Sequence, residues 1–211
     1  MIFKSRKEAG QFLAKELSDY HKDGKSLVLG LPRGGVVVAE EVAKVLCLPL
    51  DVILLRKLPY PPQPELAVGA VAEHGAVFVN DEFQDAVRED PSWLEKIVRE
   101  QRAVLHERAS LYRPHRHARD LKGKTAILVD DGIATGATMK VAIQAARAAG
   151  AAKVVVVIPV AAPSSIRELE TEADKVVCLD TPEYFYAVGQ AYQSFDQVTD
   201  EEVISILDRN P

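Results

Sequence analysis

The segment KTAILVDDGIATGATMKVAIQ, residues 124–144, joins an apolar run, two adjacent carboxylates and a loop of small residues. The run 125–129 is typical of a buried strand, and a helical pattern begins at Ala137. Gly132 and Gly136 allow the main chain to turn tightly between them, and the first turn of a helix presents N–H groups that have no intrahelical partner. The segment therefore predicts a strand–loop–helix unit whose loop binds an anion such as phosphate.

The two carboxylates, Asp130 and Asp131, constrain which anion can bind, because they would repel a bare phosphate held close to them. A sugar phosphate removes this conflict. Its phosphate accepts hydrogen bonds from the loop, while its vicinal hydroxyls, or the water shell of a bound Mg²⁺, face the carboxylates. The loop has neither the lysine of a Walker loop nor the spacing G-x-G-x-x-G. The alternative is a strand that ends at an Asp, followed by an ordinary turn and a helix cap.

The rest of the chain alternates strands and helices in the same way. Apolar runs predict strands at 26–30, 51–57, 153–160 and 175–179, and helical spacing predicts helices at 6–20, 36–47, 164–173 and from Thr199 onwards. Strands separated by helices pair in parallel through right-handed crossovers. We therefore expect one α/β domain over 1–211, with an open, mostly parallel twisted sheet flanked by helices.

Three segments stand outside this alternation. A proline-rich loop is expected at 58–65, followed by a β-hairpin at 66–80 that turns around His74 and Gly75. A helical insertion is expected at 81–112, with Asp90 as the cap of a long helix that begins at Pro91. We interpret this helix as peripheral rather than as a flap or dimer surface. Its expected apolar face consists of Leu94, Ile97, Val98, Val104, Leu105 and Leu111.

Charge and composition limit the classes of partner. The net charge of -5 gives no general attraction to nucleic acid or anionic membrane, and the longest apolar run, 154–162, is too short to cross a bilayer. We expect a cytoplasmic protein. The basic run from Arg113 to Lys124 contains His115 and His117, but it lacks the cysteines or carboxylates of a zinc site. A solvated linker is the favoured interpretation, with RNA contact as the alternative.

The string ILVDDGIATGATM, residues 127–139, closely resembles the phosphoribosyl-pyrophosphate (PRPP) signature of type I phosphoribosyltransferases. The resemblance implies that Asp130 and Asp131 hold the ribose hydroxyls and, through water, Mg²⁺. It also implies that the 5-phosphate is wrapped by the following loop, which consists of Gly132, Ile133, Ala134, Thr135, Gly136, Ala137 and Thr138.

Two further stretches support the resemblance. GLPRGG, residues 30–35, follows the first strand where the family has its pyrophosphate loop. This implies that Pro32, Arg33 and Gly34 contact the diphosphate, and that the Pro32–Arg33 peptide is cis. Arg56 and Lys57 resemble the Arg-Lys pair that closes the second strand in orotate phosphoribosyltransferases. Any one of these cations could equally be solvated surface charge, but their shared position after strands favours binding.

The resemblance implies an Mg²⁺-dependent phosphoribosyltransferase that moves the phosphoribosyl group of PRPP to a nitrogenous base and releases pyrophosphate. Arg33, Lys57 and Asp131 are the expected catalytic residues, and a homodimer is an open expectation. The alternative is a non-catalytic PRPP-binding regulator of transcription or RNA.

The sequence does not identify the base that would accept the phosphoribosyl group. Ala134 stands where enzymes of 6-oxopurines usually have an acid, and Glu65 or Asp196 could supply a base instead. The aromatic and glutamine side chains of 181–198 could form a hood over the base, or could simply pack the last strand and helix.

Overall fold

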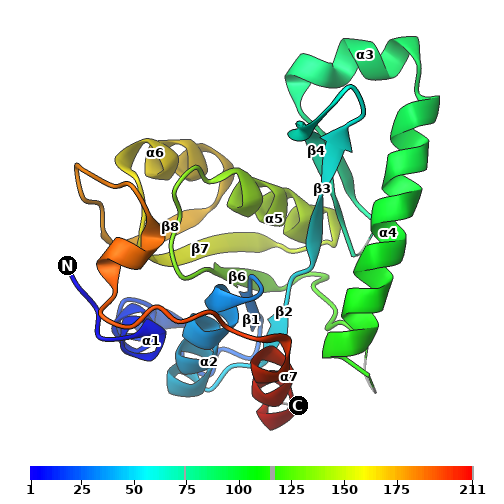
Figure 1. The fold of residues 1–211 in the computed structure, drawn as a ribbon. Helices are drawn as coiled ribbons and strands as arrows, with labels where there is room; N and C mark the ends of the chain where they lie inside the picture. The colour runs from blue at the N-terminus through cyan, green and yellow to red at the C-terminus, as the bar shows by residue number, and fades with distance from the viewer. Residues whose placement is uncertain (74, 115–116, 211) are drawn as a thin grey trace.

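The computed structural model describes residues 1–73, 75–114 and 117–210, with only the backbone described at 64, 65 and 81. Within these residues five parallel strands form the main sheet, in the order β2-β1-β6-β7-β8 (Figure 1). The predicted open parallel α/β sheet is confirmed. The strands are β1 (Ser26–Gly30), β2 (Leu50–Val52), β6 (Thr125–Val129), β7 (Lys153–Val160) and β8 (Lys175–Asp180).

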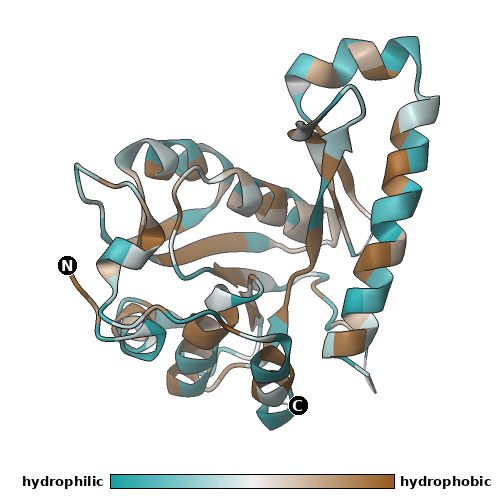
Figure 2. Cartoon of the chain, viewed as in Figure 1, coloured by the Kyte–Doolittle hydropathy of each residue, from teal (hydrophilic) through white to brown (hydrophobic). Residues whose placement is uncertain are grey.

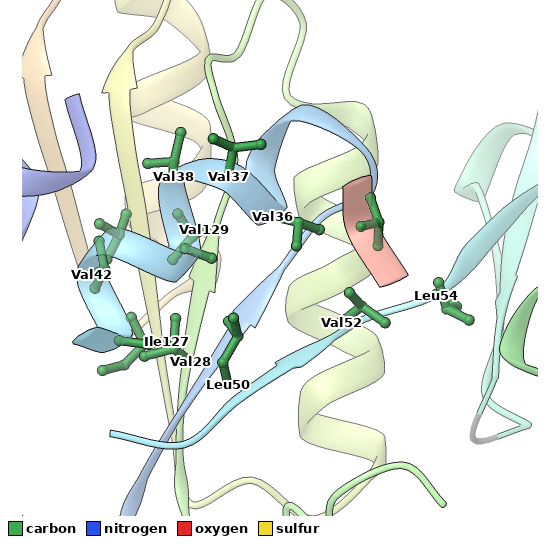
Figure 3. Packing of buried hydrophobic residues seen from close by; sticks show 14 of the residues in the cluster. Val28, Val36, Val37, Val38, Val42, Leu50, Val52, Leu54, Ile127 and Val129 are labelled. Carbon is green, nitrogen blue, oxygen red and sulfur yellow. The ribbon is translucent and has the colours of Figure 1, made fainter. Parts of the chain in front are cut away.

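Helices cover both faces of this sheet. One face carries α1 (Arg6–Lys15) and α2 (Gly34–Leu46), and the other carries α5 (Ala137–Ala148) and α6 (Pro163–Glu172) (Figure 1). Side chains alternate between the two layers along each strand, because successive residues of a strand point to opposite faces. Ile127 and Val129 pack with α2 (Figure 3), whereas Ala126 and Leu128 pack with α5. Figure 2 shows the resulting apolar strands between helices whose outer sides are hydrophilic.

The first and last helices are capped as the sequence predicts. Ser5 caps α1, and Thr199 caps α7 (Asp200–Arg209) by accepting a hydrogen bond from the Glu202 N–H at 3.2 Å, as the capping patterns predict. The first helix is shorter than predicted. It ends at Lys15, and a separate 3-10 turn, η1 (Ser18–Tyr20), follows because the buried Leu17 leaves the helical conformation.

The predicted strand 51–57 is wrong in one respect, since it is two strands. β2 ends at Val52, and β3 (Leu55–Tyr60) belongs to a separate antiparallel sheet with β4 (Gln63–Ala72) and β5 (Val77–Val79). Most of the expected proline-rich loop is therefore strand. Pro59 is accommodated at a break in the pairing register, where a residue without an N–H can sit in a strand. The hairpin of β4 and β5 is confirmed, but His74 lies outside the described residues.

The insertion contains η2 (Asp81–Phe83), α3 (Gln84–Glu89) and α4 (Ser92–Tyr112), and α4 runs alongside β3 (Figure 1). The helix begins at Ser92 with Pro91 as its N-cap residue, one position later than predicted, and Asp90 Oδ1 accepts hydrogen bonds from the N–H and hydroxyl of Ser92. The buried row is Val98, Leu105 and Tyr112 at i, i+7 spacing, together with Ile97. Val104 and Leu111, predicted for the same face, lie at its edge and are 37% and 48% exposed.

The basic run after α4 begins inside the protein, so its interpretation as a solvated linker is wrong at Arg113. This guanidinium is 4% exposed and donates to Asp51 Oδ1 at 2.8 Å, Glu73 Oε1 at 2.6 Å and the Val52 carbonyl at 2.9 Å. The Arg119 N–H donates to the other oxygen of Asp51 at 2.9 Å. These bonds attach the end of α4 to β2. His115 and Arg116 lie outside the described residues.

In the described part of the chain, no helix combines the length and the apolar character that a membrane crossing requires.

We expect Arg113→Ala to lower the free energy of unfolding by about 3–5 kcal/mol, because it leaves buried carboxylates without their cation. Urea denaturation monitored by circular dichroism measures the loss. The matched control is Arg99→Ala, an exposed arginine of α4, which should change stability by less than about 0.5 kcal/mol. Equal stability of the two variants would contradict a structural role for Arg113.

Candidate functional site

The acidic pair Asp130 and Asp131 follows directly after β6, at the carboxyl edge of the main sheet. Asp130 Oδ1 accepts a hydrogen bond from the Asp131 N–H at 2.9 Å, and Asp131 Oδ2 accepts one from Arg6 Nε at 2.7 Å. Burial raises the pKa of the Asp130 carboxyl well above its usual range, and the neighbouring Asp131 charge raises it further. Burial and the neighbouring charge therefore both disfavour the ionised form of Asp130.

The loop after the pair is anchored by its one buried apolar side chain, Ile133, as far as the described residues show. The Ile133 N–H donates to the Val160 carbonyl at 3.0 Å, and its carbonyl accepts from the Ala162 N–H at 3.1 Å. Ser165 Oγ donates to the Ala134 carbonyl at 2.8 Å. These bonds fix the outer side of the loop to β7 and α6.

The inner side of the loop is open and consists of small residues. Gly136, at the N-terminus of α5, has φ +76°, a left-handed conformation that favours glycine. A cavity of about 120 Å³ is lined by Asp130 and by residues 132–139. Helix N-termini attract anions, so this cavity suits a phosphate group.

The loop between β1 and α2 lies directly against the acidic pair. The Pro32–Arg33 peptide is cis, as the resemblance implies. A Cβ atom at Gly35 would stand 2.7 Å from the Val129 carbonyl oxygen and 2.8 Å from Asp130 Cα, and one at Gly34 would overlap the Asp131 carboxylate. Glycine at these two positions therefore permits the two loops to touch.

Arg33 lies near Asp131 and is about one-third exposed. Its Nη1 is 3.9 Å from Asp200 Oδ1, and the Tyr112 hydroxyl donates to the same oxygen. A cavity of about 410 Å³ is lined by Arg6, Arg33, Gly34, Asp131 and residues 195–198. The structure thus brings the predicted residues 33 and 34 to the acidic pair.

The structure separates the two cations of the Arg56-Lys57 pair, because neighbouring residues of β3 point to opposite faces. Lys57 lines a cavity of about 450 Å³ together with Thr135, Ala137 and Thr138. These three residues belong to the loop 132–138, which we call the anion loop. Arg56 points toward α4 instead, where its Nε donates to Gln101 Oε1 at 3.0 Å. Lys57 is therefore placed beside the loop, and Arg56 is not.

The segment 181–198 divides into a packed part and an exposed part. Tyr192 is buried, its hydroxyl donates to the Asp131 carbonyl at 2.6 Å, and its ring stacks on Phe195. Tyr184 and Tyr186 are 73% and 79% exposed, and they line a cavity of about 250 Å³ with Gln190. Packing thus accounts for one part of the aromatic group, and a base-gripping role stays a prediction for the other.

Sequence reasoning missed Arg6, which binds Asp131 from a helix 125 residues earlier in the chain. Its position in α1 carries no motif that could have indicated this contact.

Of the two candidate bases, Asp196 lies beside the acidic pair: Arg6 Nη1 donates to its main-chain carbonyl at 2.8 Å, while its carboxylate accepts from Ser194. The side chain of Glu65 lies outside the described residues.

The acidic pair and the anion loop lie at the carboxyl ends of the parallel strands. Open α/β proteins bind their ligands at this place. The phosphoribosyl transferase domain model matches residues 2–193. The chain therefore belongs to the phosphoribosyl transferase family, and its fold is that of the type I enzymes.

Individual relatives of this chain are also named after this family. Two Mycobacterium tuberculosis proteins, Rv0571c of strain H37Rv and MT0597 of strain CDC 1551, are provisionally named phosphoribosyl transferases. Each is 47% identical over 209 residues, which are 99% of this chain and 47% of the relative, so the chain spans about half the length of these relatives. The crystal structure of TT1426 from Thermus thermophilus is similar with a TM-score of 0.88 and 44% identity, covering 100% of this chain and 99% of that chain.

We expect Asp130→Asn to raise the melting temperature at neutral pH. A carboxyl whose pKa is higher in the folded than in the unfolded state weakens the fold as the pH rises from the unfolded to the folded pKa. The gain should shrink at acidic pH, where wild-type Asp130 is protonated.

Thermal unfolding of the ligand-free protein over a series of pH values measures this effect. The control Asp208→Asn alters an exposed carboxylate of α7 and should leave the pH dependence of the wild type unchanged. If the melting temperatures of the wild type and of Asp130→Asn depended on pH in the same way, ionisation of Asp130 would not destabilise the fold, and the prediction would be wrong.

Proposed function

We propose that this chain transfers the phosphoribosyl group of PRPP to a nitrogenous base with release of pyrophosphate, and that it requires Mg²⁺. The observation that carries the proposal is the contact of three parts: the pair Asp130 and Asp131, the anion loop 132–138 and the glycine loop at Gly34 and Gly35. A ligand with a phosphoester, a diol and a second anionic group matches this arrangement, and PRPP has all three.

The donor set also fits Mg²⁺. The described residues hold no group of three His, Cys, Asp or Glu side chains that could enclose a metal ion. Mg²⁺ commonly keeps several waters and binds through one or two carboxylates together with substrate phosphates. Asp130 and Asp131 would hold it through water, and a cation there would offset the effect of burial and of the Asp131 charge, which raise the pKa of Asp130. When bound, the ion would supply charge neutralisation at the diphosphate.

The chain's own cations would act on the leaving group. As the bond from C1 to the diphosphate stretches, negative charge gathers on the diphosphate, and nearby cations stabilise this state more than the ground state. Arg33 and Lys57 would have this role, which is supported by Arg33 lining a cavity with Asp131 and by Lys57 lining a cavity with Thr135 and Thr138. Asp131 would hold the ribose in position. The acceptor would approach from the side of segment 181–198, whose exposed Tyr184 and Tyr186 can stack on a planar ring.

The alternative of a PRPP-binding regulator that contacts RNA receives less support. The basic run that suggested RNA contact begins with Arg113, which is buried in ion pairs, and continues with Arg119, whose N–H and Nε donate to Asp51 and Leu50. Two of its cations thus serve the interior of the fold.

The direct assay incubates the protein with Mg²⁺, PRPP and a panel of purine and pyrimidine bases and measures pyrophosphate release. We expect base-dependent release that falls roughly tenfold to a hundredfold in Asp131→Ala and in Arg33→Ala, because each removes a charge-assisted hydrogen bond. Arg99→Ala is the control and should match the wild type. Tight PRPP binding without release for any base would favour the regulator, and wild-type rates in both variants would contradict the site.

The separation of Arg56 from Lys57 gives a second prediction. Lys57→Ala should reduce pyrophosphate release more than Arg56→Ala, because Lys57 lines the cavity beside the anion loop while Arg56 binds Gln101. Steady-state rates of the two variants measure the difference. A greater loss in Arg56→Ala would mean that β3 presents its other face to the substrate.

A further inference from the structure

We infer that Arg6 is a positioning residue, which fixes the Asp131 carboxylate in the orientation that grips PRPP. The inference rests on the proposed function, and it assigns a binding role to a residue of α1 that lies outside both family loops. Arg6 acts through Asp131 and is not expected to touch the substrate.

The contacts of Arg6 define its position closely. Nε donates to Asp131 Oδ2 at 2.7 Å, Nη1 donates to the Asp196 carbonyl at 2.8 Å, and the guanidinium carbon lies 3.8 Å from the centre of the Phe195 ring. The side chains of Arg6 and Asp131 are 11% and 15% exposed. Two hydrogen bonds and one ring contact on a planar group leave it little freedom to rotate.

The same neighbours hold the main chain of Asp131. The Tyr192 hydroxyl donates to the Asp131 carbonyl at 2.6 Å, and the Tyr192 ring lies between those of Phe3 and Phe195, with centroid distances of 5.7 Å and 5.0 Å. Asp131 is thus held at its carbonyl by Tyr192 and at its carboxylate by Arg6. When Oδ2 is fixed in this way, the direction of the second carboxylate oxygen is also fixed.

The positive charge of Arg6 is a second way in which this residue would favour PRPP binding. Asp130 and Asp131 are adjacent carboxylates, and a ligand that brings phosphates to this place meets their combined negative charge. Arg6 forms an ion pair with Asp131, whereas Arg33 Nη1 lies 3.9 Å from Asp200 Oδ1. Arg6 therefore offsets part of the repulsion without occupying the anion loop.

A purely structural role is the competing explanation, since Arg6 also connects α1 to the segment 195–196. The two roles differ in what they predict for PRPP. A structural tether would change the melting temperature of the variant and leave the affinity of the folded protein for PRPP unchanged. A positioning residue changes the affinity, and it does so only while Asp131 retains its charge.

The test measures the binding of PRPP with Mg²⁺ by isothermal titration calorimetry, after circular dichroism has shown that each variant is folded. Arg6→Ala should weaken binding by about tenfold to a hundredfold, which corresponds to the loss of one charge-assisted interaction. Arg6→Lys should recover part of this affinity, because it restores the charge but not the planar contacts. Lys7→Ala, which removes an exposed cation from the same turn of α1, should bind as the wild type does.

A double-mutant cycle shows whether Arg6 acts through Asp131. In an Asp131→Asn background, adding Arg6→Ala should change the PRPP affinity little. Unchanged affinity in the single Arg6→Ala variant would overturn the inference, and so would an equal loss in both backgrounds, because the latter would mean that Arg6 contacts the ligand itself. If Arg6→Ala does not fold, Arg6→Lys decides, and wild-type affinity there overturns the inference.

The outcome for the wild type separates this inference from the function on which it rests. A wild type that binds no PRPP would overturn the proposed function, and the inference with it. A wild type that binds PRPP and an Arg6→Ala variant that binds equally well would overturn the inference and leave the proposed function in place.

Discussion

The repulsion between Asp130 and Asp131 is the constraint on which the rest of the site depends. Adjacent carboxylates at the end of a buried strand repel each other, and the pKa of Asp130 is raised first by burial and then by the charge of Asp131. Arg6, the glycine loop at Gly34 and Gly35, and the hydroxyl of Tyr192 all lie against the pair. The fold thus keeps two carboxylates side by side in a partly buried place, and we propose that a ligand with hydroxyl groups and a bound cation offsets their charge.

The N-terminal segment 3–6 and the segment 192–196, which precedes α7, meet at this point. Phe3 and Tyr192 form an isolated parallel bridge, and Arg6 contacts Phe195 and Asp196. The end of β6 supplies the acidic pair and the anion loop, while Arg6 and Tyr192 hold Asp131 from the segments 3–6 and 192–196. Under the proposed function, stability and ligand binding share residues here, which is common at functional sites.

Much of the fold and the two main loops could be predicted from sequence, because local pattern determines them. The strand over 153–160 and the helix cap at Thr199 have periodic or capping signals within a few residues. The ion pairs of Arg6 with Asp131 and of Arg113 with Asp51 could not be predicted, since their partners are 125 and 62 residues apart. The break between β2 and β3 could not be predicted either, because the apolar run 52–55 continues across it and a change of sheet leaves no periodic signal.

The central claim is that the acidic pair holds a ribose while loop 132–138 holds its phosphate. A crystal structure of the protein soaked with PRPP and Mg²⁺ tests this most directly. The account predicts ribose hydroxyl oxygens within hydrogen-bond distance of Asp130 and Asp131, directly or through Mg²⁺-bound water, and the 5-phosphate against the N–H groups at the start of α5. Clear density for PRPP at another place, with the anion loop unoccupied, would contradict it.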